Sequence, residues 1–279
     1  MADVPVPGGS GPAITRDAVT FVGNATVIIH YGAFTLLTDP NFVPRGHRVH
    51  LGYGIVTTRL KDPALAVEDL PELDAVVLSH LHGDHWDGVA ERHLDRSLPI
   101  VTTQAAARAL RRRGFGEADG LEIWRHRTLT KGDRWVRITA LPGRHGPDPV
   151  HLLLPPVIGT LLEFGTGGST DLRLYQSGDT VMYDQIAEVR HRYPDIDLGI
   201  VHLGGTRPLN LVTVTMDGRQ GADWVETVQP DRVMPVHYDD YSVMKSPLSD
   251  FEAELRRRGL SDRMIPVERG GSIPLTRVR

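Results

Sequence analysis

Short apolar runs, separated by glycine and proline, recur along the whole chain, and most are too short to be helices. Near the start, three runs of β-branched and aromatic residues at 19–22, 26–31 and 34–39 are separated only by Gly23-Asn24 and Gly32. Runs of this composition between turn residues predict adjacent strands of one sheet. The same criterion predicts further strands at 75–78, 100–102, 135–141, 159–164, 172–176, 198–202 and 232–237.

Helical spacing of apolar residues is confined to a few segments in the rest of the chain. It predicts helices at 104–113, 217–228 and 249–258 and a short one at 86–93. Strands come first and strand–helix alternation follows, which is typical of an α/β protein whose helices cover a mixed sheet system. We expect a flexible N-terminal arm over 1–15 and one domain over 16–279, without internal repeats.

Residues 40–71 show neither strand nor helix periodicity and contain several prolines and glycines. Loops of this length inside a compact domain are usually functional or mobile. The sequence leaves two interpretations open for this segment. It is either a cover over a functional site or a poorly ordered excursion of the chain.

Composition narrows the class of protein. Among 279 residues, 40% are hydrophobic and 24% are charged, and the net charge is −4, so nothing indicates a nucleic acid or an anionic membrane as partner. No apolar stretch approaches membrane-spanning length and no secretory signal pattern is present. We therefore expect a cytoplasmic protein with a small-molecule substrate, and homo-oligomerisation is left open. Without cysteine, any metal ligands must be nitrogen and oxygen atoms.

The densest group of candidate ligands follows the apolar run at 75–78. His80, His82, Asp84 and His85 fall within six residues, on the loop expected to leave a strand's carboxyl end, where α/β proteins place their sites. Neutral imidazoles and carboxylates are the ligands that zinc and similar ions prefer. The spacing lets His80 and His82 converge on one ion, while Asp84 and His85 point toward a second position.

Three more ligand-type residues follow an apolar strand and a short turn: His145, Asp179 and His237. If these strands are roughly parallel, their ends meet at one edge of the sheet. Together with the histidine-rich loop this makes seven ligands, which is too many for one tetrahedral zinc. The set fits two ions with one bridging carboxylate and a shared water or hydroxide. Zinc is the expected ion, with manganese or iron as alternatives.

The pattern His80-x-His82-x-Asp84-His85, followed by His145, Gly178-Asp179-Thr180 and His237, resembles the metallo-β-lactamase superfamily over nearly the whole chain. Segments 21–26, 36–40 and 235–238 are similar to the branch that contains L-ascorbate phosphate lactonase and the N-acyl phosphatidylethanolamine phospholipase D type. The resemblance implies a four-layer αββα sandwich of two mixed β-sheets flanked by helices. It also implies that one metal is held by His80, His82 and His145, a second by Asp84, His85 and His237, and that Asp179 bridges them.

Departures from related patterns narrow the expected activity. The phospholipase type often has Asn-His-Tyr where this chain has Leu81-His82-Gly83, and the commonest true β-lactamases use a cysteine ligand that is absent here. Flavodiiron relatives carry glutamate at the position of His82. The resemblance therefore favours hydrolysis of a lactone or ester-like carbonyl. A phosphodiesterase on a small phosphodiester or phospholipid, an iron-dependent redox enzyme and a non-catalytic binding protein are the alternatives.

Two divalent ions lower the pKa of a bridging water, so hydroxide is available near neutral pH. Asp84 is the expected catalytic residue, both as a ligand and as a proton shuttle to the leaving group. Asp39 is expected to orient a ligand histidine, with a turn-initiating role as the alternative. The candidate substrate contacts are Tyr183, His202, Arg144, Arg207 and Tyr238, each with a structural role as the alternative. We expect no ligand among His30, His47, His50, His93, His126, His151 and His191.

Overall fold

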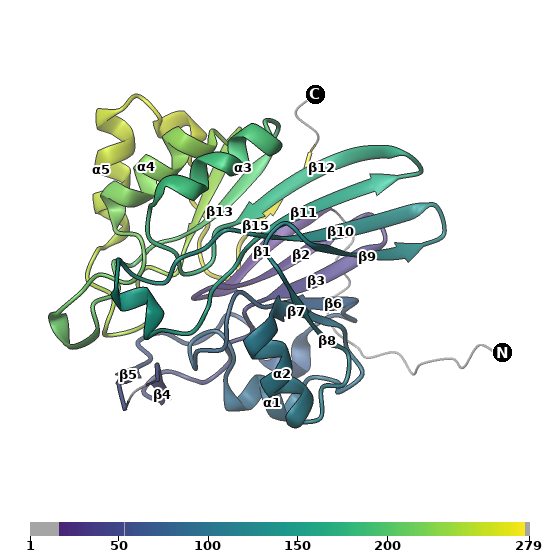
Figure 1. Cartoon of the computed structure of the whole chain (residues 1–279), viewed down its shortest axis with the longest axis horizontal. Coiled ribbons are helices and arrows are strands. Elements are labelled where there is room, and N and C mark those ends of the chain that lie inside the picture. Colours follow the sequence, from purple (N-terminus) through teal and green to yellow (C-terminus); the bar gives the residue numbers. More distant parts are fainter. Residues whose placement is uncertain (1–16, 53, 277–279) are drawn as a thin grey trace.

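Two mixed β-sheets lie face to face in the middle of the molecule, with helices on their outer sides (Figure 1). The computed structural model describes residues 17–52 and 54–276. The arm predicted at 1–15 lies outside the described residues. The α/β class and the four-layer αββα arrangement predicted from the sequence are confirmed.

The first sheet has seven strands and contains the histidine-rich loop. Its strand order is β15 (Ser272–Pro274), β1 (Ala18–Gly23), β2 (Thr26–Tyr31), β3 (Phe34–Thr38), β6 (Ala75–Val77), β7 (Ile100–Thr103) and β8 (Ala118–Leu121). The meander of β1, β2 and β3 is antiparallel, as predicted, whereas β3, β6, β7 and β8 are parallel. The carboxyl ends of β3 and β6 therefore open on the same edge of this sheet.

The second sheet has six strands, in the order β14 (Arg232–Val236), β13 (Leu198–His202), β12 (Ser169–Gln176), β11 (Gly159–Thr166), β10 (Arg134–Leu141) and β9 (His126–Lys131). β12, β13 and β14 are parallel, and β11 is antiparallel to both of its neighbours. Consequently β10, β12, β13 and β14 all run in one direction. The carboxyl ends of these four strands therefore lie at the same edge of the sheet, as predicted from the sequence.

The core between the sheets consists of aliphatic side chains from both inner faces. The first sheet contributes residues such as Val27, Leu36 and Val77, and the second contributes Ile138, Leu162 and Ile200, all of them buried. Alternation along the strands places these residues on the inner face. Because each sheet buries its inner face against the other, the packed pair fixes the loops at the common edge.

Helices cover the two outer faces. On the first sheet lie α1 (Gly88–His93) and α2 (Gln104–Arg112), and on the second lie α3 (Ala187–Arg192), α4 (Gly218–Val228) and α5 (Leu248–Arg257) (Figure 1). Trp224 of α4 packs so closely on Gly199 of β13 that a Cβ there would lie 2.7 Å from the indole ring. Glycine at this position therefore lets the largest buried side chain of α4 approach the sheet.

Several elements differ from the sequence-based expectation. Residues 40–71 are not wholly irregular, because β4 (Arg48–His50) and β5 (Val56–Thr58) form a hairpin and η1 (Val67–Asp69) follows. The remaining 3-10 turns are η2 (Val150–Leu152), η3 (Asp184–Ile186), η4 (Pro208–Asn210) and η5 (Ser261–Arg263). Strands β8, β9 and β15 and helix α3 were not predicted. Among the described residues, no helix combines the length and apolar character that crossing a bilayer requires.

Candidate metal centre

All seven predicted ligands lie together at the common edge of the two sheets. The loop after β6 carries His80, His82, Asp84 and His85, and loops after β10, β12 and β14 carry His145, Asp179 and His237. Ligand-type atoms form two adjacent groups, within each of which all of them lie within 4.8 Å of one another. The two sheets thus contribute to one centre, four residues from the first sheet and three from the second.

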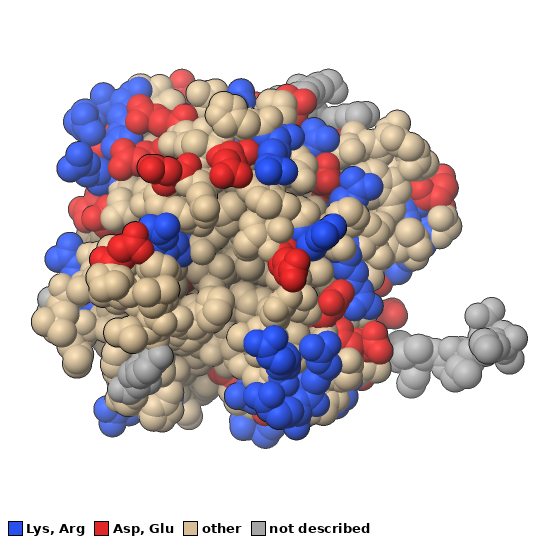
Figure 2. Space-filling view, in the orientation of Figure 1, with Lys and Arg blue, Asp and Glu red and all other residues tan. Residues whose placement is uncertain are grey.

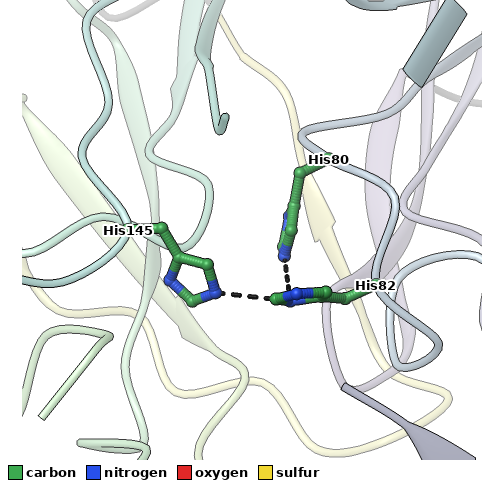
Figure 3. A group of neighbouring side chains, drawn as sticks. All are labelled: His80, His82 and His145. Atoms are coloured by element: carbon green, nitrogen blue, oxygen red, sulfur yellow. Dashed lines mark hydrogen bonds between the residues drawn. The ribbon is translucent and has the colours of Figure 1, made fainter. Parts of the chain in front are cut away.

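The first group contains His80, His82 and His145, whose rings point toward a common centre (Figure 3). Nδ1 of His82 lies 2.9 Å from Nε2 of His80 and 3.3 Å from Nε2 of His145. All three side chains are buried. Three imidazole nitrogens at this spacing match the three-histidine arrangement known for zinc.

The other ring nitrogens of this group fix the orientation of two of the rings. Nδ1 of His145 donates to the carbonyl oxygen of Val214 at 2.9 Å, and Nδ1 of His80 shares a hydrogen bond with Oγ of Ser79 at 3.0 Å. A hydrogen bond on one nitrogen selects the tautomer and directs the other nitrogen toward an ion. The Nε2 atoms of His80 and His145 are therefore directed toward the candidate metal position.

The second group contains Asp84, His85, Asp179 and His237, all buried. Oδ2 of Asp179 lies 3.2 Å from Nε2 of His85 and 3.6 Å from Nε2 of His237, and Oδ2 of Asp84 lies 3.3 Å from the latter atom. The rings of His80 and His85 are 4.3 Å apart between centroids, so the two groups touch. Nδ1 of His237 donates to the carbonyl oxygen of Leu203 at 3.2 Å, which orients this ring as well.

The residues present fit metal ions, because several of their buried polar atoms lack protein partners. These atoms are Oδ1 of Asp84, Oδ1 of Asp179 and Nε2 of His82. Buried polar atoms are nearly always satisfied, so a concentration of unsatisfied ones in a single place calls for a ligand. Nitrogen and carboxylate oxygen donors suit zinc, manganese and iron. The donor set alone does not distinguish among these ions.

Electrostatics separate the two groups. Burial lowers the pKa of His80 and His145, and lowers that of His82 to about 3, so these imidazoles are neutral. Burial also opposes charge on His85, but the carboxylates of Asp179, Asp84 and Asp39 outweigh it and hold the pKa of His85 well above its usual value. The imidazoles of the first group are therefore neutral, whereas His85 in the second group favours its protonated form.

Asp39, directly after β3, contacts several residues that lie beneath the candidate metal centre. Its Oδ1 accepts from the backbone N–H of Ser79 at 2.7 Å, and its Oδ2 accepts from Nε2 of Gln176 at 2.7 Å. The same Oδ2 lies 3.4 Å from Nδ1 of His85 and 3.4 Å from Nε2 of His202. Burial opposes ionisation of Asp39, but the imidazoles of His85 and His202 keep its pKa below the usual value. These contacts place Asp39 directly behind the ring of His85.

Asn24 joins the two halves of the second group, a connection that sequence reasoning did not identify. Its Nδ2 donates to the carbonyl oxygen of Asp84 at 2.7 Å, and its own carbonyl accepts from the N–H of His237 at 2.9 Å. Asn24 has φ of 53°, a conformation in which asparagine is common at turns. The adjacent Gly23-Asn24 pair signals such a turn, but not the partners of its amide.

The β4–β5 hairpin packs against the histidine-rich loop. The N–H of Gly83 donates to the carbonyl oxygen of His50 at 3.1 Å, and a Cβ on Gly52 would lie 3.8 Å from Nε2 of His82. The segment after the hairpin is tied down by the fully buried Arg59, whose guanidinium donates to the carbonyl of Asn41 at 2.9 Å. The hairpin therefore covers the His82 side of the centre.

The five candidate substrate contacts have different surroundings. His202 is buried against Asp39 and Ser177, and its ring stacks 6.0 Å from that of His85. Arg144 pairs with Asp148 at 2.9 Å and lies over the ring of Tyr183 at 4.3 Å, so these two candidates contact each other. Nε of Arg207 donates to Thr213. Tyr238 lines a cavity whose described lining includes none of the seven ligands.

The histidines that the sequence analysis set aside lie outside the metal-ligand groups found among the described residues. Two of them lie next to carboxylates elsewhere. Nδ1 of His93 lies 3.1 Å from Glu68, and Nδ1 of His151 lies 2.9 Å from Asp148. His50 contributes only its backbone to the hairpin contact described above.

Fold and site together define a class: αββα proteins with histidine and aspartate side chains gathered for metal ions at the shared edge of two sheets. The chain belongs to the metallo-β-lactamase superfamily, since the family model described as the beta-lactamase superfamily domain matches residues 35–238. The resemblance inferred from the motifs is thereby confirmed for the superfamily. The narrower likeness to the lactonase and phospholipase branch stays a prediction.

Individual relatives are distant but similar along most of their length. The UPF0173 protein YddR of Bacillus subtilis is 25% identical over 264 residues, which cover 91% of this chain and 98% of the relative. A UPF0173 metal-dependent hydrolase of Deinococcus radiodurans is 25% identical over 247 residues, covering 88% and 94%. The crystal structure of an isothiocyanate hydrolase from Delia radicum gut bacteria has a TM-score of 0.78 at 20% identity and covers 92% of this chain and 99% of its own.

Proposed function

We propose that this protein is a dinuclear metal hydrolase, with zinc as the expected ion, that acts on a lactone or ester-like carbonyl. The observation that carries this proposal is the contact between the two ligand groups. His80 and His85 touch, and Oδ2 of Asp179 lies next to His85 and His237. In this arrangement His80, His82 and His145 would hold one ion, Asp84, His85 and His237 would hold the other, and Asp179 lies where its carboxylate would serve both.

When bound, a pair of divalent ions lowers the pKa of water and polarises a substrate oxygen. The chain's own residues set the geometry. Backbone and side-chain acceptors behind His80, His85, His145 and His237 fix the rings, so their ligand nitrogens need not reorganise on binding. Oδ1 of Asp84 is buried and without a protein partner, which leaves it available to hold a proton destined for the leaving group.

The carbonyl preference rests on the similarity of segments 21–26, 36–40 and 235–238 to the lactonase-containing branch. An isothiocyanate also presents an electrophilic carbon, so the fold neighbour adds a second carbon electrophile worth assaying. Hydrolysis of a phosphodiester is the alternative on the same ligand set. The same metal ligands would serve attack on a carbonyl carbon and attack on phosphorus. Only assays with both kinds of substrate distinguish the two reactions.

The test is a substrate panel on zinc-loaded protein whose metal content has been measured. The panel contains lactones of several ring sizes, p-nitrophenyl esters, benzyl isothiocyanate and bis-p-nitrophenyl phosphate. We expect about two ions per chain and turnover of carbonyl substrates. Turnover confined to the phosphodiester would overturn the substrate class, and a protein that retains no metal would overturn the function.

Asp84→Asn keeps the size of the side chain but removes its charge and its capacity to hold a proton between two oxygens. We expect kcat to fall by about 10²–10⁴-fold, the usual contribution of a positioned acid or base. Asp95→Asn, an exposed carboxylate on the loop after α1, is the matched control and keeps wild-type kcat. Circular dichroism checks that both variants are folded. Unchanged turnover in Asp84→Asn would rule out its role.

A further inference from the structure

A cavity of about 590 Å³ opens beside His145, and none of the proposals above uses it. Its walls come from the start of α2, the end of β8 and the segment 143–158 between β10 and β11. Among the seven candidate ligands, only His145 lines it. The cavity therefore meets the centre on the side of the first ligand group, and its volume is typical of small-molecule sites.

The wall of this cavity is largely apolar. Its larger aliphatic residues are Leu121, Ile123, Leu152, Leu154, Val157 and Ile158. Val157 and Ile158 are buried at the inner end, whereas Leu152 is 74% exposed at the mouth. Folding gains nothing from an exposed leucine, and apolar residues that cluster around a cavity mark a binding site.

Charge on the wall is either paired or exposed at the mouth. Arg144 is paired with Asp148, and Glu122 accepts a hydrogen bond from Nε2 of Gln104 at 3.3 Å. Arg108 and Glu122 are exposed and of opposite sign. On the face seen in Figure 2, a mostly uncharged surface with a few charged side chains of both signs lies between the cationic cluster over α2 and the charged helices α3–α5. An ionic group has no buried counter-charge here, so an uncharged occupant is favoured.

The segment 143–158, which forms much of the cavity wall, is hydrogen-bonded to loops that carry candidate metal ligands. At the start of the 143–158 segment, the carbonyl of Arg144 accepts from the N–H of Val181 at 2.9 Å, two residues after Asp179. At its end, the N–H of Ile158 donates to the carbonyl of Ser79 at 3.1 Å, next to His80. Both ends are thus fixed to ligand loops, which holds the wall at a constant position relative to the centre.

We infer that this cavity is the subsite for an uncharged apolar group, a medium-length alkyl chain or an aryl ring, attached to the carbonyl carbon that is hydrolysed. The inference rests on the proposed function and specifies its substrate class. A group seated against Leu152, Leu154 and Val157 has its attached carbonyl next to His145. Substrates whose acyl side is small or charged leave the cavity unfilled or bury an unpaired charge.

The first experiment measures kcat/KM of zinc-loaded protein for p-nitrophenyl esters with acetyl, butanoyl, hexanoyl and octanoyl chains, and for the succinyl ester. Each methylene that is buried raises kcat/KM by about two- to fourfold until the cavity is filled. The succinyl ester, with a terminal carboxylate, falls below the butanoyl ester of equal chain length. A flat series, or a preference for succinyl, overturns the inference.

Three variants test whether the preference for longer acyl chains arises from this cavity. Ala105→Trp, on the cavity side of α2, fills it, and Leu152→Asn makes its mouth polar. Both lower the hexanoyl-to-acetyl ratio of kcat/KM, by about tenfold or more for Ala105→Trp. Leu211→Asn is the matched control, because Leu211 is as exposed as Leu152 (76% against 74%) but does not line this cavity. An equal effect of Leu152→Asn and Leu211→Asn would overturn the assignment.

A binding measurement separates this inference from the hydrolase proposal. N-methylhexanamide carries a hexanoyl chain on its carbonyl carbon, is uncharged and resists hydrolysis, and its binding to the zinc-loaded protein is followed by saturation-transfer NMR. If no ester is hydrolysed but the amide binds and Ala105→Trp abolishes its signal, the subsite stands and the hydrolase proposal fails. If esters turn over but the amide signal is absent or unaffected by Ala105→Trp, the subsite fails and the hydrolase proposal stands.

Discussion

Asp39 acts on the centre through its neighbours, because it lies behind the ligand histidines. Each of its oxygens faces donors: Oδ1 accepts from the N–H and the hydroxyl of Ser79, and Oδ2 accepts from Gln176. An acceptor surrounded in this way cannot rotate, and it holds the imidazole of His85 at 3.4 Å with its far nitrogen toward Asp179. Carboxylate–histidine–metal chains of this kind orient a ligand and increase its basicity.

Asp39→Asn tests this role. Whichever way the new amide is turned, its NH₂ group faces a donor, either Ser79 or Gln176. We expect the affinity for the second ion to fall by about 10–100-fold and the first to change little, measured by zinc competition with a chromophoric chelator. Asp62→Asn is the control, since Asp62 also accepts a backbone N–H, that of Arg45 at 2.7 Å, but is exposed and belongs to none of the candidate metal groups. Unchanged affinity for both ions would contradict the role.

Acidification is expected to release the two ions in a fixed order. The carboxylates around His85 raise its pKa well above the usual value, so in the metal-free centre this histidine is protonated near neutrality and an ion must displace the proton. The lowered pKa values of His80, His82 and His145 remove this competition from the first group. As pH falls, the ion of the second group is therefore lost first.

Dialysis of zinc-loaded protein at stepwise lower pH, followed by elemental analysis, should show about two ions, then one, then none. His237→Ala, which lacks one ligand of the second group, should begin near one ion and show only the later loss. Simultaneous loss of both ions in the unaltered protein, or earlier loss in the variant, would contradict this order.

At the scale of residues, the sequence predicted which side chains meet but not what supports them. The seven ligand-type residues stand out because histidine and aspartate directly after apolar strands are unusual. Ser79, Gln176 and Asn24 carry no such signal, since polar residues of these types are common next to turns. Their roles depend on contacts with Asp39 and Asp84 that are distant in sequence and become visible only in the folded chain.

At the scale of elements, each candidate ligand lies on a loop that follows a strand. In the turn after β12, Gly178 precedes Asp179 and is tightly constrained by its backbone conformation and its neighbours. It has φ of 63°, and a Cβ there would lie 2.6 Å from the carbonyl oxygen of Ile158 and 3.1 Å from Cβ of Ser79. The turn after β12 therefore packs directly against the His80 loop and the end of the cavity wall. Only glycine combines this backbone conformation with so close an approach.

Gly178→Ala should both strain the backbone and push these three segments apart. We expect a loss of about 2–4 kcal/mol in the free energy of unfolding, from left-handed strain and overpacking together, measured by urea denaturation. Gly167→Ala is a matched control, because Gly167 has φ of 58° but nothing within 4 Å of its would-be Cβ. It should lose only about 1–2 kcal/mol. Equal losses in the two variants would show that the packing is unimportant.

The elements that the sequence missed are mostly at edges. Strands β8, β9 and β15 lie at the ends of their sheets, where fewer side chains are buried, and β9 reads His-Arg-Thr-Leu-Thr-Lys with hardly an apolar residue. β15 ends in a proline, which an edge strand tolerates. Central strands such as β6 and β13 are fully buried and were predicted because burial on both faces demands a continuous apolar run.

At the scale of the whole molecule, the candidate centre lies across the junction of the two sheets. One loop of the first sheet contributes His80, His82, Asp84 and His85, and three loops of the second contribute the remaining ligands. Metal-free, this junction buries the carboxylates of Asp39, Asp84 and Asp179 close together. Bound ions would therefore add cross-links between the sheets and offset buried negative charge.

Metal removal should accordingly lower the stability of the entire fold. An ion at 100 times its Kd adds about 2.7 kcal/mol, and in a chain of this size each kcal/mol shifts Tm by roughly 2–4 °C. With two ions bound, we expect EDTA-treated protein to melt about 10–20 °C below the zinc-loaded form and zinc to restore it, as followed by differential scanning calorimetry. His237→Ala should lose a large part of this shift, whereas His126→Ala, an exposed histidine outside the centre, should keep all of it. A Tm that is indifferent to zinc, or equally sensitive in the two variants, would show that the cluster at the sheet junction does not bind ions and would remove the basis of the proposed function.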